Sequence, residues 1–274
     1  RRVLFRSVAQ RILELQDEGV ELNEMAVLYR AHFHSMELQM ELTTERIPFV
    51  ITSGLKFFEQ AHIKDFTAYL KLAVNPRDES AFDRIVQMLP GVGAASAGKM
   101  WREWRLGGPG KAGSAPESWV AALNEIKVPP RAVKDWQQVG FTLDEFTQAG
   151  ELQNPEKIMH SLWNGVYEDY VKATFENAEQ RSQDVQQFMR FASQFESLEA
   201  LLSEMSLLSG PESAQGMKSA KSKKEAAAES VTLSSIHQAK GLEWKVVFII
   251  WLTDGMFPNG RVMEQEAESG LEEE

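Results

Sequence analysis

Residues 230–258, SVTLSSIHQAKGLEWKVVFIIWLTDGMFP, constrain the fold of this chain more than any other stretch. They place a short strand around Val231 and Leu233 and an apolar run at 246–252 on either side of a polar turn. Runs of β-branched and bulky residues like these are typical of strands buried on both faces in an α/β sheet. The turn is therefore expected at a strand end, where open α/β sheets bind ligands.

The polar turn contains His237, Lys240, Gly241 and Glu243. His and Lys can bind phosphate, Gly lets a ligand approach the backbone, and Glu can accept a hydrogen bond from a ribose hydroxyl. A simple polar connection with a glycine cap has the same composition. Residue types alone therefore leave a ligand site and a structural turn both open.

The order and spacing of SSIHQAKGLEWKVVFII, followed by DGMFP, resemble motif V of the UvrD/PcrA/Rep-like superfamily 1 DNA helicases. Residues 25–42, MAVLYRAHFHSMELQMEL, and the stretch 47–86 that begins IPFVITSGLKFFEQ are similar to another segment of these helicases. That segment runs from the second RecA-like domain into its inserted helical domain. The stretches occur in the order that the family has.

The resemblance implies an α/β fold with a large all-α insertion. A split RecA-like domain, of the P-loop NTPase-like kind but lacking the Walker loop, is expected at residues 1–58 and 230–274. A helical domain with a flexible return linker is expected at 59–229. The local pattern agrees, because 25–29 and 49–52 favour strands and 35–46 favours a helix with Ser35 as its cap.

The middle of the chain has the apolar period of helices, and Pro76 ends the first of them. Further helices are predicted at 81–88, 96–105, 118–126, 131–148, 155–175 with breaks, and 184–208. Residues 106–116 and 209–229 are rich in Gly, Pro, Ser, Ala or Lys, which is typical of flexible connections.

The resemblance also assigns roles to single residues. Arg30, His32, Ser235 and His237 are expected to contact the DNA backbone. The nucleotide-binding residues are expected to be Lys240 and Gly241, which shape the turn, and Glu243, which faces the nucleotide sugar.

Three positions qualify this assignment. Relatives often have Asn in place of His32, Arg in place of Met36 and a small residue in place of Trp251. Alternatively, His32 and His34 are surface residues of a loop. A metal pair is not expected there, since no Cys and no carboxylate at ligand spacing accompanies them.

A second motif, LPGVGAASAGKM at 89–100, lies between two predicted helices. Its turn can present backbone amides and the start of a helix to a phosphate. It resembles the hairpin of a helix-hairpin-helix element, and it lies where the family grips duplex backbone. Gly91, Val92 and Gly93 are thus expected to contact duplex DNA, although tight helix-helix turns use the same glycine pattern.

Phe57 and Phe58 lie where the two domains are expected to join. Single-strand-binding proteins use such rings as base platforms. Core packing is the alternative and the default, because most aromatic residues here fit core spacing.

Net charge does not settle the nucleic-acid question. The chain carries −11, but residues 264–274 hold six acids and no base, which leaves the remainder near −5. Basic residues gather in two groups: Lys56, Lys64, Lys71, Arg77 and Arg84, and Lys99, Arg102 and Arg105. Each group also fits a solvated helix face.

Other features limit the class of protein. The chain has no cysteine, so it has no disulfide or thiolate site, which suits a cytoplasmic protein. No apolar run approaches the roughly 18 residues of a membrane span, so no membrane partner is expected.

No GxxxxGK[ST] phosphate loop occurs in the sequence. The chain is therefore expected to be the C-terminal portion of an ATP-dependent DNA helicase, without the first RecA-like domain and ending before the last motif. The intact enzyme would use ATP and Mg²⁺ to translocate on single-stranded DNA and unwind duplex, in DNA repair or replication. The portion itself would bind DNA without turnover and hold no cofactor. A helicase-nuclease subunit and a non-catalytic interaction module are the alternatives.

Overall fold

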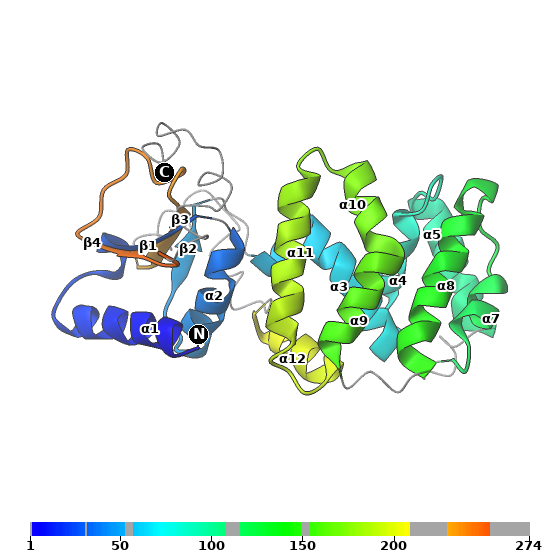
Figure 1. The fold of residues 1–274 in the computed structure, drawn as a ribbon, viewed down its shortest axis with the longest axis horizontal. Helices are drawn as coiled ribbons and strands as arrows, with labels where there is room; N and C mark the ends of the chain where they lie inside the picture. Colours follow the sequence, from blue (N-terminus) through cyan, green and yellow to red (C-terminus); the bar gives the residue numbers. More distant parts are fainter. Residues whose placement is uncertain are drawn as a thin grey trace, which may run out of the picture. The chain divides into compact units, whose positions relative to one another are not determined.

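The computed structural model describes residues 2–30, 32–52, 57–107, 116–148, 154–208 and 229–252. Two compact units are distinguished along the chain (Figure 1): a sheet unit, Arg1–Phe57 with Leu208–Glu274, and a helical unit, Phe58–Leu207. The sheet unit is thus built from two segments that are far apart in sequence. The expected flexible connections and the DGMFP stretch lie largely or wholly outside the described residues.

A four-stranded sheet, in the order β2-β3-β1-β4, forms the sheet unit. Its strands are β1 (Met25–Tyr29), β2 (Phe49–Ile51), β3 (Val231–Ser235) and β4 (Val246–Ile249), and every neighbouring pair is parallel. The central strand β1 therefore lies between two strands from the far end of the chain. The α/β class expected from the sequence is confirmed.

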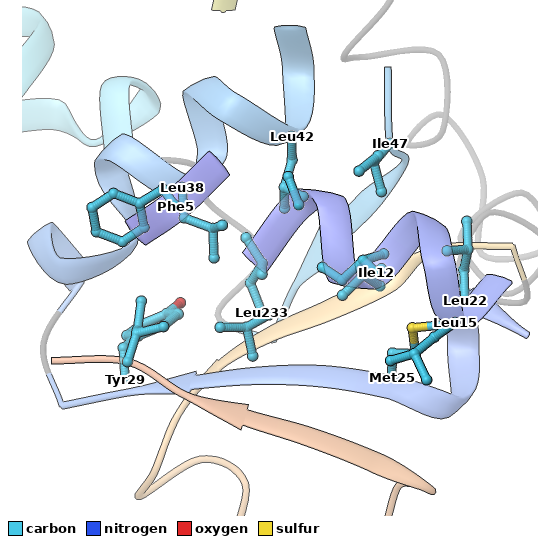
Figure 2. Packing of buried hydrophobic residues seen from close by; sticks show 14 residues of the cluster. Phe5, Ile12, Leu15, Leu22, Met25, Tyr29, Leu38, Leu42, Ile47 and Leu233 are labelled. Carbon is cyan, nitrogen blue, oxygen red and sulfur yellow. The ribbon is translucent and has the colours of Figure 1, made fainter. Parts of the chain in front are cut away.

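Helices α1 (Arg2–Asp17) and α2 (Met36–Thr44) build the core of this unit with strands β1 and β3. Phe5 and Ile12 of α1, Leu38 of α2 and Leu233 of β3 belong to one cluster, in which the helices cover the sheet (Figure 2). These four side chains are almost completely buried. Two 3₁₀ turns, η1 (Leu22–Glu24) and η2 (His32–Ser35), lie before and after β1.

Strand β4 differs from the prediction of a strand buried on both faces. Val246 and Phe248 pack against the core, whereas Val247 and Ile249 are 44% and 48% exposed. The reason is position, because β4 is an edge strand with one covered face among the described residues. Val231 and Leu233 of the internal strand β3 are fully buried.

Ser35 does not cap helix α2, contrary to the prediction. Its backbone is already helical, with φ −88° and ψ −8°, because η2 leads directly into the helix. Its hydroxyl accepts a hydrogen bond from Gln39 Nε2 at 2.8 Å, and Gln39 Oε1 accepts one from the Phe57 amide at 3.3 Å. Ser35 therefore begins a buried polar chain that ends where the polypeptide leaves the sheet unit.

The helical unit is all α in its described parts. Most predicted helices are present with shifted ends, and a π-helical turn, η6, interrupts the stretch predicted at 155–175. The single helix predicted at 184–208 is wrong, because two helices form there and residues 193–197 separate them. The elements are η3 (Phe57–Glu59, which begins at the last residue of the sheet unit), α3 (Ala61–Val74), α4 (Glu79–Gln87), α5 (Ala94–Gly107), α7 (Trp119–Asn124), η4 (Pro130–Ala132), α8 (Val133–Gln148), α9 (Pro155–Leu162), η6 (Trp163–Tyr167), α10 (Glu168–Thr174), α11 (Ala178–Ala192) and α12 (Leu198–Leu208).

Aromatic side chains fill the core of the helical unit. Phe58 meets Phe188 of α11 edge to face at 5.7 Å, and Phe66 of α3 lies 5.2 Å from Tyr167 of η6. Phe58 is 5% exposed, and Phe57, in the sheet unit, is 1% exposed. Core packing of both rings is therefore confirmed, and neither serves as a base platform.

A buried polar cluster joins α3 to α11. Arg181 Nη1 lies 2.7 Å from His62 Nδ1, and His62 Nε2 lies 3.1 Å from Asp184 Oδ2. A guanidinium can only donate, so Nδ1 accepts and the ring proton is on Nε2, facing the carboxylate. The Tyr167 hydroxyl donates to the His62 carbonyl at 2.7 Å. The cluster thus fixes the start of α3 against two later helices.

The turn η6 requires a glycine where it passes α8. A Cβ added to Gly165 would lie 2.6 Å from Thr142 Oγ1 and 3.4 Å from Thr142 Cγ2. Thr142 is itself 3% exposed. The close approach of η6 to α8 therefore depends on the absence of a side chain at residue 165.

Candidate DNA and nucleotide interface

The carboxyl ends of β1 and β3 bring two distant segments together. Tyr29 is the register partner of Ser235, and the Ile236 amide donates to the Tyr29 carbonyl at 3.0 Å. Arg30 follows β1 directly, and His237 lies two residues beyond the end of β3. Both segments therefore leave the sheet at the same edge.

The turn after β3 is closed by hydrogen bonds to Ser235. The Ser235 carbonyl accepts from the amides of Gln238 and Ala239, both at 3.0 Å. Its hydroxyl also accepts from the Gln238 amide at 3.3 Å. Ser235 is only 9% exposed, so its first role is to shape the turn.

Gly241 completes this turn with a left-handed backbone, φ +83°. A Cβ there would meet nothing within 4 Å, so the requirement for glycine is conformational. His237, Lys240 and Glu243 are exposed. The turn thus presents two basic side chains and a carboxylate from a rigid backbone.

On the β1 side, Arg30 and the turn η2 form what we call the edge loop. His34 in η2 is 3% exposed, so it is a buried residue, and the alternative of a surface position is wrong for His34. Burial, with a further contribution from the Arg30 charge, lowers the pKa of His34 to about 4. His34 is therefore neutral beside Arg30 at neutral pH.

Met36 and His32 are two other residues of the first motif. Met36 is 2% exposed, so its side chain belongs to the core and is not available for a contact with DNA. His32 begins η2, but its side chain lies outside the described part of the structure. The expected contact by His32 thus remains a prediction.

Trp251 is a part of this edge that the sequence motifs did not assign. Its indole Nε1 donates to the His34 carbonyl at 2.9 Å, and its ring stacks on the His34 ring at 5.5 Å and 27°. Phe5 lies 5.9 Å from the same indole. The one signal in the sequence was the large residue at a position where relatives have a small one.

The hairpin in the helical unit is formed, but its three residues differ. Gly91 has φ +78°, and both Gly91 and Gly93 are exposed. Val92 is 8% exposed and its amide donates to the Leu89 carbonyl at 3.2 Å. The side chain and the amide of Val92 thus anchor the hairpin, and the expected DNA contact by Val92 remains a prediction.

Residues 93–100, GAASAGKM, fit the phosphate-loop pattern GxxxxGK[ST] except at the last position. The pattern requires a loop between a strand and a helix. Here α5 begins at Ala94, so Gly98 and Lys99 lie inside the helix. This stretch therefore cannot wrap around a triphosphate as that loop does.

Metal ligands and membrane spans are two other features that a site could include. Within the described ranges, no three His, Asp or Glu side chains gather as metal ligands would. None of the helices there is long and apolar enough to cross a membrane.

Comparison with known proteins places this geometry in context. The protein-family model of the UvrD-like helicase C-terminal domain matches residues 4–105 and 131–274 of this chain. ATP-dependent DNA helicase PcrA of Bacillus subtilis is 28% identical over 280 residues, covering 97% of this chain and 36% of that protein. DNA helicase II of Escherichia coli is 28% identical over 288 residues, covering 98% and 37%. The chain spans little more than a third of the length of these relatives.

Proposed function

The chain belongs to the family of UvrD-like helicase C-terminal domains, and on this premise we propose that it binds DNA within an ATP-dependent DNA helicase. The observation that carries the proposal is the pairing of Tyr29 with Ser235, which brings Arg30 and His237 to one sheet edge. We assign single-stranded DNA to this edge. In the complete enzyme the edge would hold one strand during translocation and unwinding, in DNA repair or replication.

The DNA contacts follow from the exposure of each group. Arg30 is half-buried and His237 is exposed, so both can reach a phosphate from a fixed backbone. Ser235 is nearly buried, and its hydroxyl oxygen already accepts a hydrogen bond from the Gln238 amide. We therefore assign its hydroxyl proton as the group that donates to DNA. His32 is assigned as a further donor.

We assign one side of an ATP site to Lys240, Gly241 and Glu243. The exposed Glu243 carboxylate fits a ribose hydroxyl, and Gly241 lets a ligand approach the backbone. The described residues do not form a loop that would cradle the β- and γ-phosphates. A companion RecA-like domain would supply that loop and hold Mg²⁺, which neutralises phosphate charge during transfer. This chain alone is expected to show no ATP turnover, and turnover that disappears on Glu243→Ala would contradict the assignment.

We assign duplex backbone to the hairpin in the helical unit. Gly91 and Gly93 are exposed there, and α5 begins directly after them. Gly93→Val is the sharper test, because its Cβ would enter open space and its φ is not positive. We expect weaker duplex binding across all sequences at low salt, as for a backbone contact. Unchanged affinity would return the hairpin to a purely structural role.

The main experiment is a titration of a short single-stranded oligonucleotide at several salt concentrations. Arg30→Ala and His237→Ala should each weaken binding while the fold is kept. The salt slope should fall by about 0.7 for each phosphate that the variant no longer neutralises, and for His237 only if it is charged. Arg190→Ala removes an exposed charge from α11 and serves as the matched control. If neither edge variant changes affinity or slope, a protein-interaction module becomes the better explanation.

A further inference from the structure

Trp251 has a backbone conformation that its residue type disfavours. Its φ is +64°, and Arg46 is the other non-glycine residue with a positive φ in the described ranges. A left-handed conformation is unfavourable for a residue with a Cβ, and it persists where surrounding contacts hold it. The contacts of the indole therefore indicate what Trp251 does.

Those contacts all lead to the edge loop and to α1. The indole both donates to the His34 carbonyl at 2.9 Å and stacks on the His34 ring. Phe5 packs on the indole from α1, and Phe5 is itself 1% exposed. Trp251 thus joins the end of β4 to the turn η2 across 217 residues of sequence.

The edge loop is fastened at its far end as well. Ser35, the residue after His34, is buried directly before α2. Ser35 also accepts from Gln39 on α2. Arg30 thus lies between the end of β1 and two neighbouring fixed residues, His34 and Ser35.

We propose that Trp251 is a positioning residue for single-strand binding, which holds His34 and thereby orders the edge loop that carries Arg30. This inference rests on the proposed function, since Arg30 must contact DNA for its position to matter. In this proposal Trp251 acts through His34 and makes no contact of its own with DNA. The positive φ at residue 251 suits glycine better than tryptophan. The proposal explains the tryptophan, because its indole orders the edge loop.

A double-mutant cycle between Trp251 and Arg30 tests this proposal. Trp251→Gly relieves the backbone conformation and removes the indole, so we expect single-strand affinity to fall about fivefold while the fold is kept. In the Arg30→Ala background the same change should have little further effect on affinity or salt slope. Trp251→Phe keeps the ring and loses the indole N–H, so its affinity should lie between those of the parent and the glycine variant.

The outcomes separate the positioning role of Trp251 from the DNA edge itself. Leu252→Gly, at an exposed neighbour that is 57% accessible, controls for added backbone freedom and should bind normally. If Arg30→Ala weakens binding but Trp251→Gly does not, or if their effects simply add, the positioning role is wrong and the DNA edge stands. If Arg30→Ala leaves binding unchanged, the DNA edge is wrong and the positioning role is wrong with it.

Discussion

Replacing Gly165 by Ala should destabilise the helical unit, although alanine is the better helix former. The added Cβ would lie 2.6 Å from Thr142 Oγ1, closer than side-chain carbons approach their neighbours. Thr142 cannot simply turn away, because its Cγ2 already lies 3.4 Å from the same point and its χ1 is restricted in a helix. The turn η6 and helix α8 must therefore separate.

The magnitude follows from two opposing terms. Overpacking a well-packed core costs about 1–3 kcal/mol. Replacing glycine by alanine in a helix raises the free energy of unfolding by up to about 1 kcal/mol, because alanine has the higher helix propensity. We expect the free energy of unfolding to fall by about 1–2 kcal/mol, which corresponds to a fall in Tm of about 2–8 °C for a unit of this size.

Denaturant unfolding followed by tryptophan fluorescence is the assay, because five of the seven tryptophans lie in the helical unit. Gly98→Ala is the matched control: its Cβ would meet nothing within 4 Å, so it should be neutral or stabilising. Thr142→Ala should restore part of the stability in the Gly165→Ala background. A Gly165→Ala protein as stable as the parent, or no rescue by Thr142→Ala, would refute the steric reasoning.

Three further predictions concern single residues of the two units. Gly241→Ala should lower the free energy of unfolding by about 1 kcal/mol through its positive φ alone, and Gly241→Asn by less, as measured by denaturant unfolding. His34 should make stability fall as pH drops from about 6.5 toward 4, because its folded pKa is lowered to about 4; His34→Gln should flatten this part of the pH profile, and an unchanged profile would contradict the shift. Asp144 accepts from the Trp119 and Val120 amides and from the Ser118 hydroxyl, so Asp144→Ala should speed amide exchange in α7 and cost about 1–2 kcal/mol, whereas Glu145→Ala on the exposed side should not.

The strands and most helices could be predicted because their apolar periods are local properties of the sequence. The covered face of β4 could not, since residues 246–250 are apolar at every position and only the strand order shows which face is open. The missing cap at Ser35 has a similar cause. A serine before an apolar run favours a cap, but the preceding 3₁₀ turn gives it a helical backbone.

The residues of the candidate site could be predicted where they belong to a sequence motif. They could not be predicted where their position depends on a contact between residues far apart in the sequence. Arg30 and His237 meet at one edge because their strands are parallel neighbours. The contact of Trp251 with His34, by contrast, joins residues 217 positions apart, and no local pattern in the sequence indicates it. Val92 shows the same limit on a smaller scale, because the glycine pattern predicts a turn but not which amide closes it.

The strand order β2-β3-β1-β4 also has a consequence for how the chain folds during synthesis. β1 and β2, the two strands made first, are not neighbours, and each pairs with β3. Neither can form its ladder with β3 until residues 231–235 have left the ribosome. The helical unit, which lies between β2 and β3 in the sequence, is rich in local contacts. Local structure forms quickly and pairing across long loops slowly. The helical unit is therefore expected to be folded while the first sheet segment is still waiting for its partners, which makes β1 and β2 the segments most exposed to mispairing.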